Sequence, residues 1–199
     1  MKKKTFIRAC VLIILAVVLT VMIKFYCDLI KDKYSNSTSN NVPSMGSNVP
    51  GGNNSSSVTK TGAKEFTADD TSTGEEYTSS NSDENAILVK DGANVSISDG
   101  TVDKSAGDST NVENSEFYGV NADILVDSSS SATLKNMKIT TSAKGANGVF
   151  STGTDSKIYI SDSEISTTKD SSRGLDATYG GYIEADNVTI STKGGSCAT

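Results

Sequence analysis

Two stretches near the end of the chain carry apolar residues in the same positions: Ser156-Lys-Ile-Tyr-Ile-Ser-Asp-Ser-Glu-Ile165 and Gly181-Tyr-Ile-Glu-Ala-Asp-Asn-Val-Thr-Ile190. The two copies are 25 residues apart, and two more copies precede them. A repeat of this length that cannot bury its own apolar face is typical of a solenoid, in which stacked copies share one core. The sequence therefore predicts an all-β solenoid of about four coils.

Four apolar columns define the repeat. They are Ile87, Ile124, Phe150, Leu175; Val95, Ala132, Ile158, Ile183; Ile97, Leu134, Ile160, Ala185; and Val102, Ile139, Ile165, Ile190. The second and third columns are two residues apart, so their side chains point to one face of a short strand. The copies start 37, 26 and 25 residues apart, and the long first interval predicts a loop of about a dozen residues around 103–118.

A fifth column is polar and follows the third by two residues: Asp99, Asn136, Asp162 and Asn187. Asp and Asn suit tight turns because their side chains bond nearby backbone and tolerate the left-handed conformation. Stacking would place the four side chains in a turn ladder. Turn chemistry is the favoured interpretation, and a calcium-binding rail is the alternative, since carboxylate and amide oxygens are calcium ligands. No metal site can be assigned from the spacing.

Four segments carry a family resemblance: Gly119-Val-Asn-Ala122, Leu134-Lys-Asn-Met-Lys-Ile139, Gly145-Ala-Asn-Gly-Val-Phe150 and Ser172-Arg-Gly-Leu-Asp-Ala-Thr-Tyr-Gly-Gly181. They resemble the right-handed parallel β-helix superfamily, the pectate-lyase-like fold. More narrowly, they resemble bacterial cell-surface β-helix proteins of uncharacterised function. The resemblance covers roughly residues 84–199 and implies a scaffold and a surface role, not an activity.

The charge is unevenly distributed. Residues 60–199 hold 11 basic and 22 acidic side chains, whereas basic side chains predominate in residues 1–33. An acidic domain repels phosphate backbones, so we expect no nucleic-acid partner. The three cysteines, Cys10, Cys27 and Cys197, form neither a disulfide framework nor a metal-binding spacing.

The first 33 residues are predicted to be a cytoplasmic start and a transmembrane signal-anchor. Residues 9–23 carry no charge, and if Arg8 and Lys24 snorkel, the apolar span extends over residues 6–26. That is close to the roughly 20 residues a membrane helix needs. A cleaved signal peptide is the alternative, but no small-residue cleavage site follows. The basic start predicts a single-pass protein of the cell membrane, with its N-terminus in the cytoplasm and the solenoid outside.

Residues 34–82 are predicted to be a disordered linker, because they are rich in Ser, Thr, Asn and Gly. The β-helix domain is expected over residues 83–199. The fourth copy ends close to Thr199, where a fifth coil would begin, so we expect the domain to be incomplete at its C-terminus.

Few residues point to chemistry. The chain has no histidine, which removes Ser-His and Cys-His nucleophiles and the usual zinc ligand sets. Beyond the anchor the only arginine is Arg173, three residues before Asp176. These two are candidate ligand-binding residues, although a surface ion pair at a turn is the favoured interpretation. Tyr179 and Tyr182 are candidates for stacking against sugars.

We therefore expect a membrane-anchored cell-surface protein with a non-enzymatic, adhesin-like or display role, contacting an extracellular glycan or cell-wall polymer. No cofactor is expected, apart from calcium if the rail forms. A calcium-dependent polysaccharide lyase, or another carbohydrate-active enzyme, is the first alternative, and it leaves open whether the protein is an enzyme. A passive structural spacer is the second.

Overall fold

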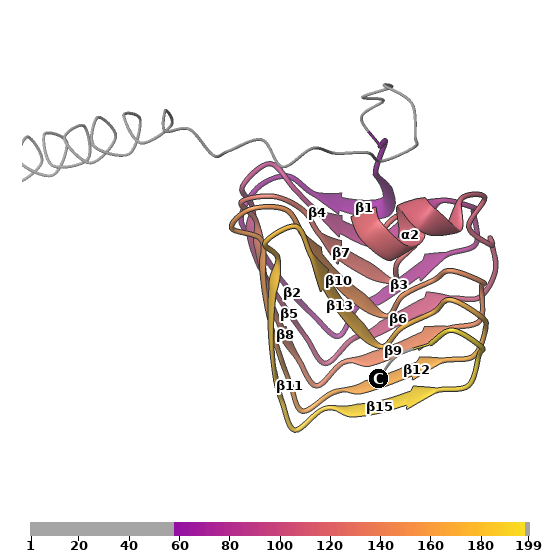
Figure 1. Ribbon diagram of the computed structural model, residues 1–199. Coiled ribbons are helices and arrows are strands. Elements are labelled where there is room, and N and C mark those ends of the chain that lie inside the picture. Colours follow the sequence, from indigo (N-terminus) through magenta and orange to yellow (C-terminus); the bar gives the residue numbers. More distant parts are fainter. Residues whose placement is uncertain (1–57, 198–199) are drawn as a thin grey trace, which may run out of the picture. The chain divides into compact units, whose positions relative to one another are not determined.

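The computed structural model describes residues 58–197, which form a parallel β-solenoid of five coils (Figure 1). Each coil contributes one strand to each of three five-stranded parallel sheets, which we call sheets A, B and C. The predicted all-β solenoid is thus confirmed, while its right-handed sense stays a prediction. Within residues 58–197 no helix is long and apolar enough to cross a bilayer. The predicted membrane segment lies outside these residues.

The strands follow one another in the order A, B, C around every coil. Sheet A contains β1 (Thr61–Phe66), β4 (Glu84–Val89), β7 (Ile124–Val126), β10 (Val149–Thr152) and β13 (Leu175–Thr178). Sheet B contains β2 (Asp70–Thr73), β5 (Asn94–Ser98), β8 (Ser131–Lys135), β11 (Lys157–Ser161) and β14 (Tyr182–Asp186). Sheet C contains β3 (Glu76–Ser79), β6 (Thr101–Lys104), β9 (Lys138–Thr141), β12 (Glu164–Thr167) and β15 (Thr189–Thr192).

The predicted apolar columns form the core between the three sheets. The second, third and fourth columns pair residue by residue as predicted. The first column was wrong at one position. Val149, not Phe150, pairs with Ile124 and Leu175, and Phe150 pairs with Leu125. Both neighbours are apolar, and Val149 precedes Ile158 by nine residues, whereas Ile124 precedes Ala132 by eight, so a constant spacing selected the wrong residue.

An additional coil precedes the four predicted ones. Strands β1, β2 and β3 lie within the segment predicted to be a linker, so the solenoid begins at Thr61 rather than near residue 83. Its core positions are occupied by Lys64, Asp70 and Ser72, which pair with Ile87, Val95 and Ile97. A polar outer coil is what a solenoid end needs, because one face of that coil meets water. This polarity hid the coil from a search for apolar columns.

The end coil still contributes an apolar lid. Phe66 and Tyr77 are buried and meet edge to face, with ring centroids 6.4 Å apart. The Tyr77 hydroxyl is hydrogen-bonded to the Ser72 hydroxyl at 2.6 Å. A buried tyrosine needs such a partner for its polar end. These contacts close the core at the first coil.

The turn ladder forms as predicted. Its four residues all have a left-handed backbone, with φ between 52° and 57°. The Asn136 amide donates to the Asp99 carboxylate, and the Asn187 amide donates to the Asp162 carboxylate, each at 2.8 Å. The ladder therefore alternates acceptor and donor along the stack, which explains why both residue types occur in it.

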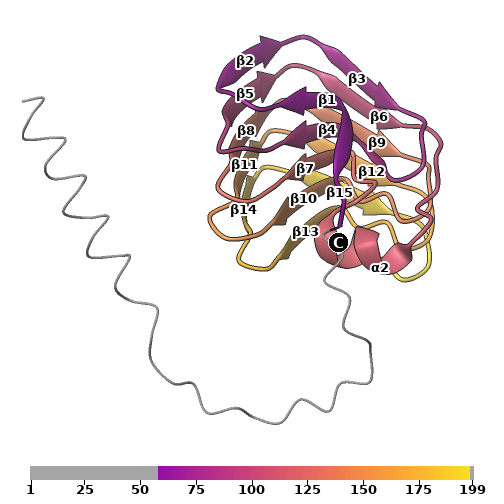
Figure 2. The same ribbon diagram turned by 90° about the horizontal axis from the view of Figure 1, so that it is seen from above.

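The predicted insertion lies between the second and third coils, and it contains a helix after an irregular segment, residues 105–111. Helix α2 spans Val112–Tyr118 and is capped by the Asn111 side chain, which accepts a hydrogen bond from the Asn114 N–H at 3.2 Å. Gly119, with φ of 70°, ends it. Seen from above, α2 lies outside the solenoid, beside sheet A (Figure 2). The helix has less than two turns of apolar periodicity, too short for the sequence to reveal it.

Candidate functional site

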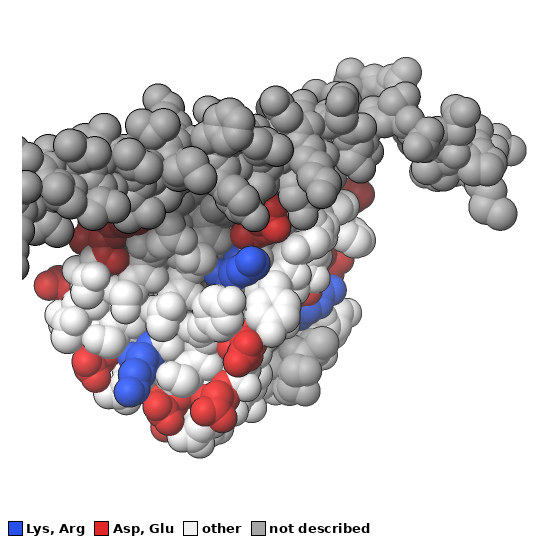
Figure 3. Space-filling view, turned by 90° about the vertical axis from the view of Figure 1, so that its left-hand side faces the viewer, with Lys and Arg blue, Asp and Glu red and all other residues white. Residues whose placement is uncertain are grey.

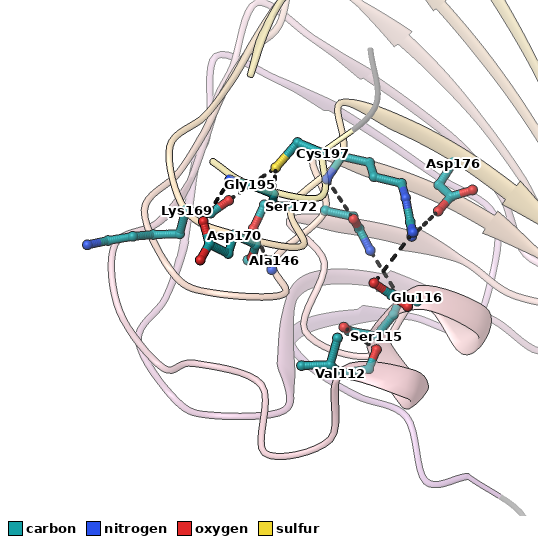
Figure 4. Close-up of polar contacts among 12 residues, drawn as sticks. Val112, Ser115, Glu116, Ala146, Lys169, Asp170, Ser172, Asp176, Gly195 and Cys197 are labelled. Carbon is teal, nitrogen blue, oxygen red and sulfur yellow. Dashed lines mark hydrogen bonds and ion pairs between the residues drawn. The ribbon is translucent and has the colours of Figure 1, made fainter. Parts of the chain in front are cut away.

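The insertion helix and the last coil meet at Arg173, which lies just before β13. Its Nη1 contacts Asp176 Oδ2 at 3.0 Å, and its Nη2 contacts Glu116 Oε1 at 3.5 Å. Glu116 belongs to α2 and Asp176 to β13 (Figure 4). We call these three residues the arginine clamp. The predicted pair of Arg173 and Asp176 is brought together, with a third member that the sequence did not reveal.

Hydrogen bonds fix α2 in place around the clamp. Asn147 Nδ2 donates to the carbonyl oxygen of Ser115 at 3.0 Å, and Asn147 Oδ1 accepts from the Arg173 N–H at 2.8 Å. At the other end of the helix, Thr178 Oγ1 donates to the Phe117 carbonyl oxygen at 2.8 Å. The helix is therefore joined to two successive coils, and the position of Glu116 is well defined.

Apolar side chains that point outward from sheet A lie against Gly119, at the C-terminal end of α2. They form a second buried cluster: Leu88, Ala122, Leu125 and Phe150. A Cβ added at Gly119 would lie 2.5 Å from Leu125 Cδ1 and 2.7 Å from Phe150 Cδ1. The end of the helix thus approaches the sheet as closely as glycine allows. This cluster explains why Phe150 is apolar although it does not belong to the first core column.

Charge within the clamp is set by burial and by Arg173. Burial raises the pKa of Asp176 from its ordinary value, and this outweighs the opposing effect of the Arg173 guanidinium. Arginine keeps its proton in proteins and offers only donors. Both ends of this guanidinium are occupied by carboxylates of the same chain, so the clamp is built to hold α2 rather than to accept a proton.

Exposed aromatic rings lie beside the clamp. Tyr118 and Tyr179 stack with ring centroids 5.3 Å apart and an interplanar angle of 22°. Tyr179 is 57% exposed and Phe117 47% exposed. We call these three residues the aromatic platform. A pair of stacked rings presents an apolar surface with polar edges, which suits the C–H face of a pyranose.

The remaining predicted site residue, Tyr182, makes different contacts. Its ring meets Tyr159 of sheet B at 6.2 Å between centroids, and its hydroxyl donates to Glu184 at 3.0 Å. The predicted ligand-binding set therefore divides into two. Arg173, Asp176 and Tyr179 lie around α2, whereas Tyr182 belongs to the outer face of sheet B.

The ladder carboxylates are used within the protein. The Asn136 hydrogen bond lowers the pKa of Asp99 below its ordinary value. No group of three or more His, Cys, Asp or Glu side chains in the described part of the chain is placed to hold a metal ion. Calcium binding stays an untested prediction.

A buried polar corner was not foreseen from the sequence. Lys104 is fully buried, and its Nζ donates to the carbonyl oxygens of Asn81 and Glu84 at 2.8 and 2.9 Å. Asp123 is also fully buried, and neither of its carboxylate oxygens has a hydrogen-bond partner among residues 58–197. Burial lowers the pKa of Lys104 and raises that of Asp123 well above its ordinary value. Lys104 follows core Val102 by two residues, and this spacing was a signal that its side chain points inward.

Comparisons with known protein families, curated proteins and solved structures find no match to this chain. The parallel solenoid rests on the structure itself. Membership of the pectate-lyase-like superfamily stays a prediction.

Proposed function

We propose that this chain is a non-enzymatic, glycan-contacting module of adhesin-like character, anchored in the cell membrane and displayed at the cell surface. The observation that carries the proposal is the aromatic platform, whose helix is joined to the last coil by the arginine clamp and by the Thr178–Phe117 hydrogen bond. The anchor itself is argued from the uncharged N-terminal segment alone.

Rigidity supports a binding role for the platform. Two of its rings are stacked, and the helix that carries Phe117 and Tyr118 is tied to β13 through Thr178. Aromatic side chains held in place lose little conformational freedom when a ligand binds, so more of the contact energy appears as affinity.

The charges around the platform favour an uncharged glycan. Glu113, Glu116 and Asp176 all lie on the elements that form it, against the single positive charge of Arg173. Uronate polymers would meet net negative charge there, and like charges oppose association. A neutral hexose chain would meet no such repulsion.

The lyase alternative is disfavoured by the same geometry. Removing a proton from a sugar ring requires a base within reach of the substrate. Arg173 has both guanidinium ends engaged by carboxylates. The chain has no histidine that could act as this base.

Binding of neutral oligosaccharides to the full-length chain in detergent tests the proposal, with titration calorimetry as the measurement. Tyr179→Ala should weaken binding about three- to tenfold, since one aromatic contact contributes about 0.5–1.5 kcal/mol. Tyr179→Phe retains the stacked ring and should bind like the wild type. If no glycan binds, or if Tyr179→Ala binds unchanged, the platform is not the site.

The enzymatic alternative is tested on the same preparation. Acidic polysaccharides are incubated with calcium, and the absorbance of unsaturated products is followed. We expect none to form. Product formation that disappears in Arg173→Ala would replace the binding role with a lyase activity, and the absence of glycan binding together with the absence of products would favour the passive spacer.

A further inference from the structure

Among residues 58–197, no helix lies against the outer face of sheet B, whereas α2 lies beside sheet A. A shallow groove of about 550 Å³ crosses its first three strands, lined by Asp69, Asp70, Thr71, Asn94, Val95, Ser96, Ser131 and Thr133. On this side of the molecule, where β2, β5, β8 and β11 lie, most of the surface is uncharged (Figure 3). Small hydroxyl side chains leave the strands close to the surface, which is why the groove exists.

The polar groups of the groove are pre-arranged. Asp69 Oδ1 accepts from the backbone N–H of Asn94 at 2.8 Å and from its side-chain amide at 3.2 Å. Ser131 Oγ donates to Asn94 Oδ1 at 2.7 Å. No described residue donates to the second Asp69 oxygen in this arrangement. A fixed carboxylate beside an amide and free hydroxyls matches a sugar diol, whose hydroxyls both donate and accept.

Aromatic rings continue the same face. Tyr159 follows Ser96 and Thr133 in one outward column of paired residues, and Tyr182 follows Ser131 and Lys157 in the next. The two rings are 41% and 48% exposed. The face therefore has a hydroxyl-lined end and an aromatic end, and with neighbouring strands about 4.8 Å apart it spans about 19 Å from β2 to β14.

We propose that this face is a second glycan-binding site, which takes an extended, uncharged chain of β-linked hexoses running across the strands. Asp69, Asn94 and the neighbouring hydroxyls would bind the sugar hydroxyls, and Tyr159 and Tyr182 would stack on the ring faces. The occupant is an extended chain because the two binding elements, the groove and the tyrosine pair, lie several strands apart. The inference goes beyond the aromatic platform and does not depend on it.

Cello-oligosaccharides of two to six residues are suitable probes, titrated into the full-length chain in detergent. Affinity should rise with length, because only a long chain reaches both ends of the face. For the hexamer, Asp69→Ala and Tyr159→Ala should each weaken binding about tenfold. The dimer should be affected by at most one of these substitutions. Circular dichroism and thermal melting establish that both variants remain folded.

The Tyr179→Ala variant separates this site from the platform. Length-dependent hexamer binding that persists in Tyr179→Ala but is lost in Tyr159→Ala supports a second site, whatever the platform binds. Hexamer affinity equal to that of the dimer, or unchanged in both Asp69→Ala and Tyr159→Ala, overturns it. A hexamer of galacturonate that binds as well as the neutral hexamer would also overturn the proposal of an uncharged ligand.

Discussion

Phe150 and Tyr159 lie on successive strands of the same coil and both point outward, yet their surroundings are opposite. Phe150, on sheet A, is fully buried beneath the end of α2, whereas Tyr159, on sheet B, is 41% exposed. The backbone ladders are of the same parallel kind in the two sheets. What differs is the outward column, which is Leu88, Leu125 and Phe150 in one sheet and Ser96, Thr133 and Tyr159 in the other.

The comparison shows how one repeat yields two kinds of surface. The core columns fix the solenoid, and the outward columns then decide whether a face is covered or left open to a ligand. On sheet A, the outward apolar residues pack against the end of α2, and this helix carries part of the aromatic platform. The outer face of sheet B keeps its hydroxyl groups available.

The largest effect should come from Phe150→Ala. It removes a fully buried ring from beneath α2, and such truncations cost about 3–5 kcal/mol of unfolding free energy. Tyr159→Ala is the matched control and should cost only about 1 kcal/mol, because that ring is 41% exposed and contacts the Tyr182 ring. Chemical denaturation followed by circular dichroism measures both. Equal losses of unfolding free energy in the two variants would mean that the outer faces of sheets A and B do not differ in burial as described.

Gly119→Ala should have the second-largest effect and lower the free energy of unfolding by about 2–4 kcal/mol. The substitution forces a left-handed residue to carry a Cβ, and that Cβ would press against Leu125 and Phe150. Gly92 has a similar φ of 81° but open space around it, so Gly92→Ala should cost only about 1–2 kcal/mol. The difference between the two isolates the close contact from the backbone strain. A difference near zero would show that α2 sits less tightly than the structure indicates.

Asp123→Asn should change how stability depends on pH. The raised pKa of Asp123 means that folding favours its protonated form. The wild type should therefore lose stability as pH rises above the ordinary value of an unfolded aspartate, until the folded pKa is reached. The slope for one proton has a ceiling of about 1.4 kcal/mol per pH unit.

The asparagine variant lacks this titration, so its advantage over the wild type should be small at pH 4 and larger at pH 8. Denaturation midpoints at the two pH values provide the measurement. An advantage that does not change with pH would show that folding does not raise the pKa of Asp123.

Arg173→Ala should have the smallest effect, about 1 kcal/mol, because its two ion pairs are partly exposed. The loss should be local, seen as faster hydrogen exchange of the α2 amides with little change elsewhere. Lys90→Ala removes a comparable ion pair with Glu65, distant from α2, and should leave α2 exchange unchanged. Uniformly faster exchange in the Arg173 variant would argue against a role specific to the helix.

The core was predictable because its aliphatic residues recur at fixed spacing. That spacing was enough to predict the burial of Val95, Ile97, Val102 and their equivalents in the other coils. The first coil was missed because polar side chains occupy its core positions, as the water-facing end of a solenoid requires. Phe150 was assigned to the wrong column because its neighbour Val149 is also apolar.

The candidate site was predictable only where its members are close in sequence. Arg173 and Asp176 are three residues apart, and Tyr179 follows them. Glu116 and Tyr118 join the site through an insertion that folds back over two coils. No local sequence pattern predicts that this insertion contacts the later coils. Asp123 and Lys104 were hidden because charged residues are normally expected outside a core.

The alternation in the turn ladder sets a rule for how such a protein could lengthen. Asp99 is satisfied by Asn136, and Asp162 by Asn187, so the coils are coupled as doublets. Duplicating a single coil would set carboxylate against carboxylate or amide against amide at this corner, whereas duplicating a doublet would preserve every bond. Growth by recombination should therefore favour even steps, with a genetic unit of about 50–60 residues rather than 25.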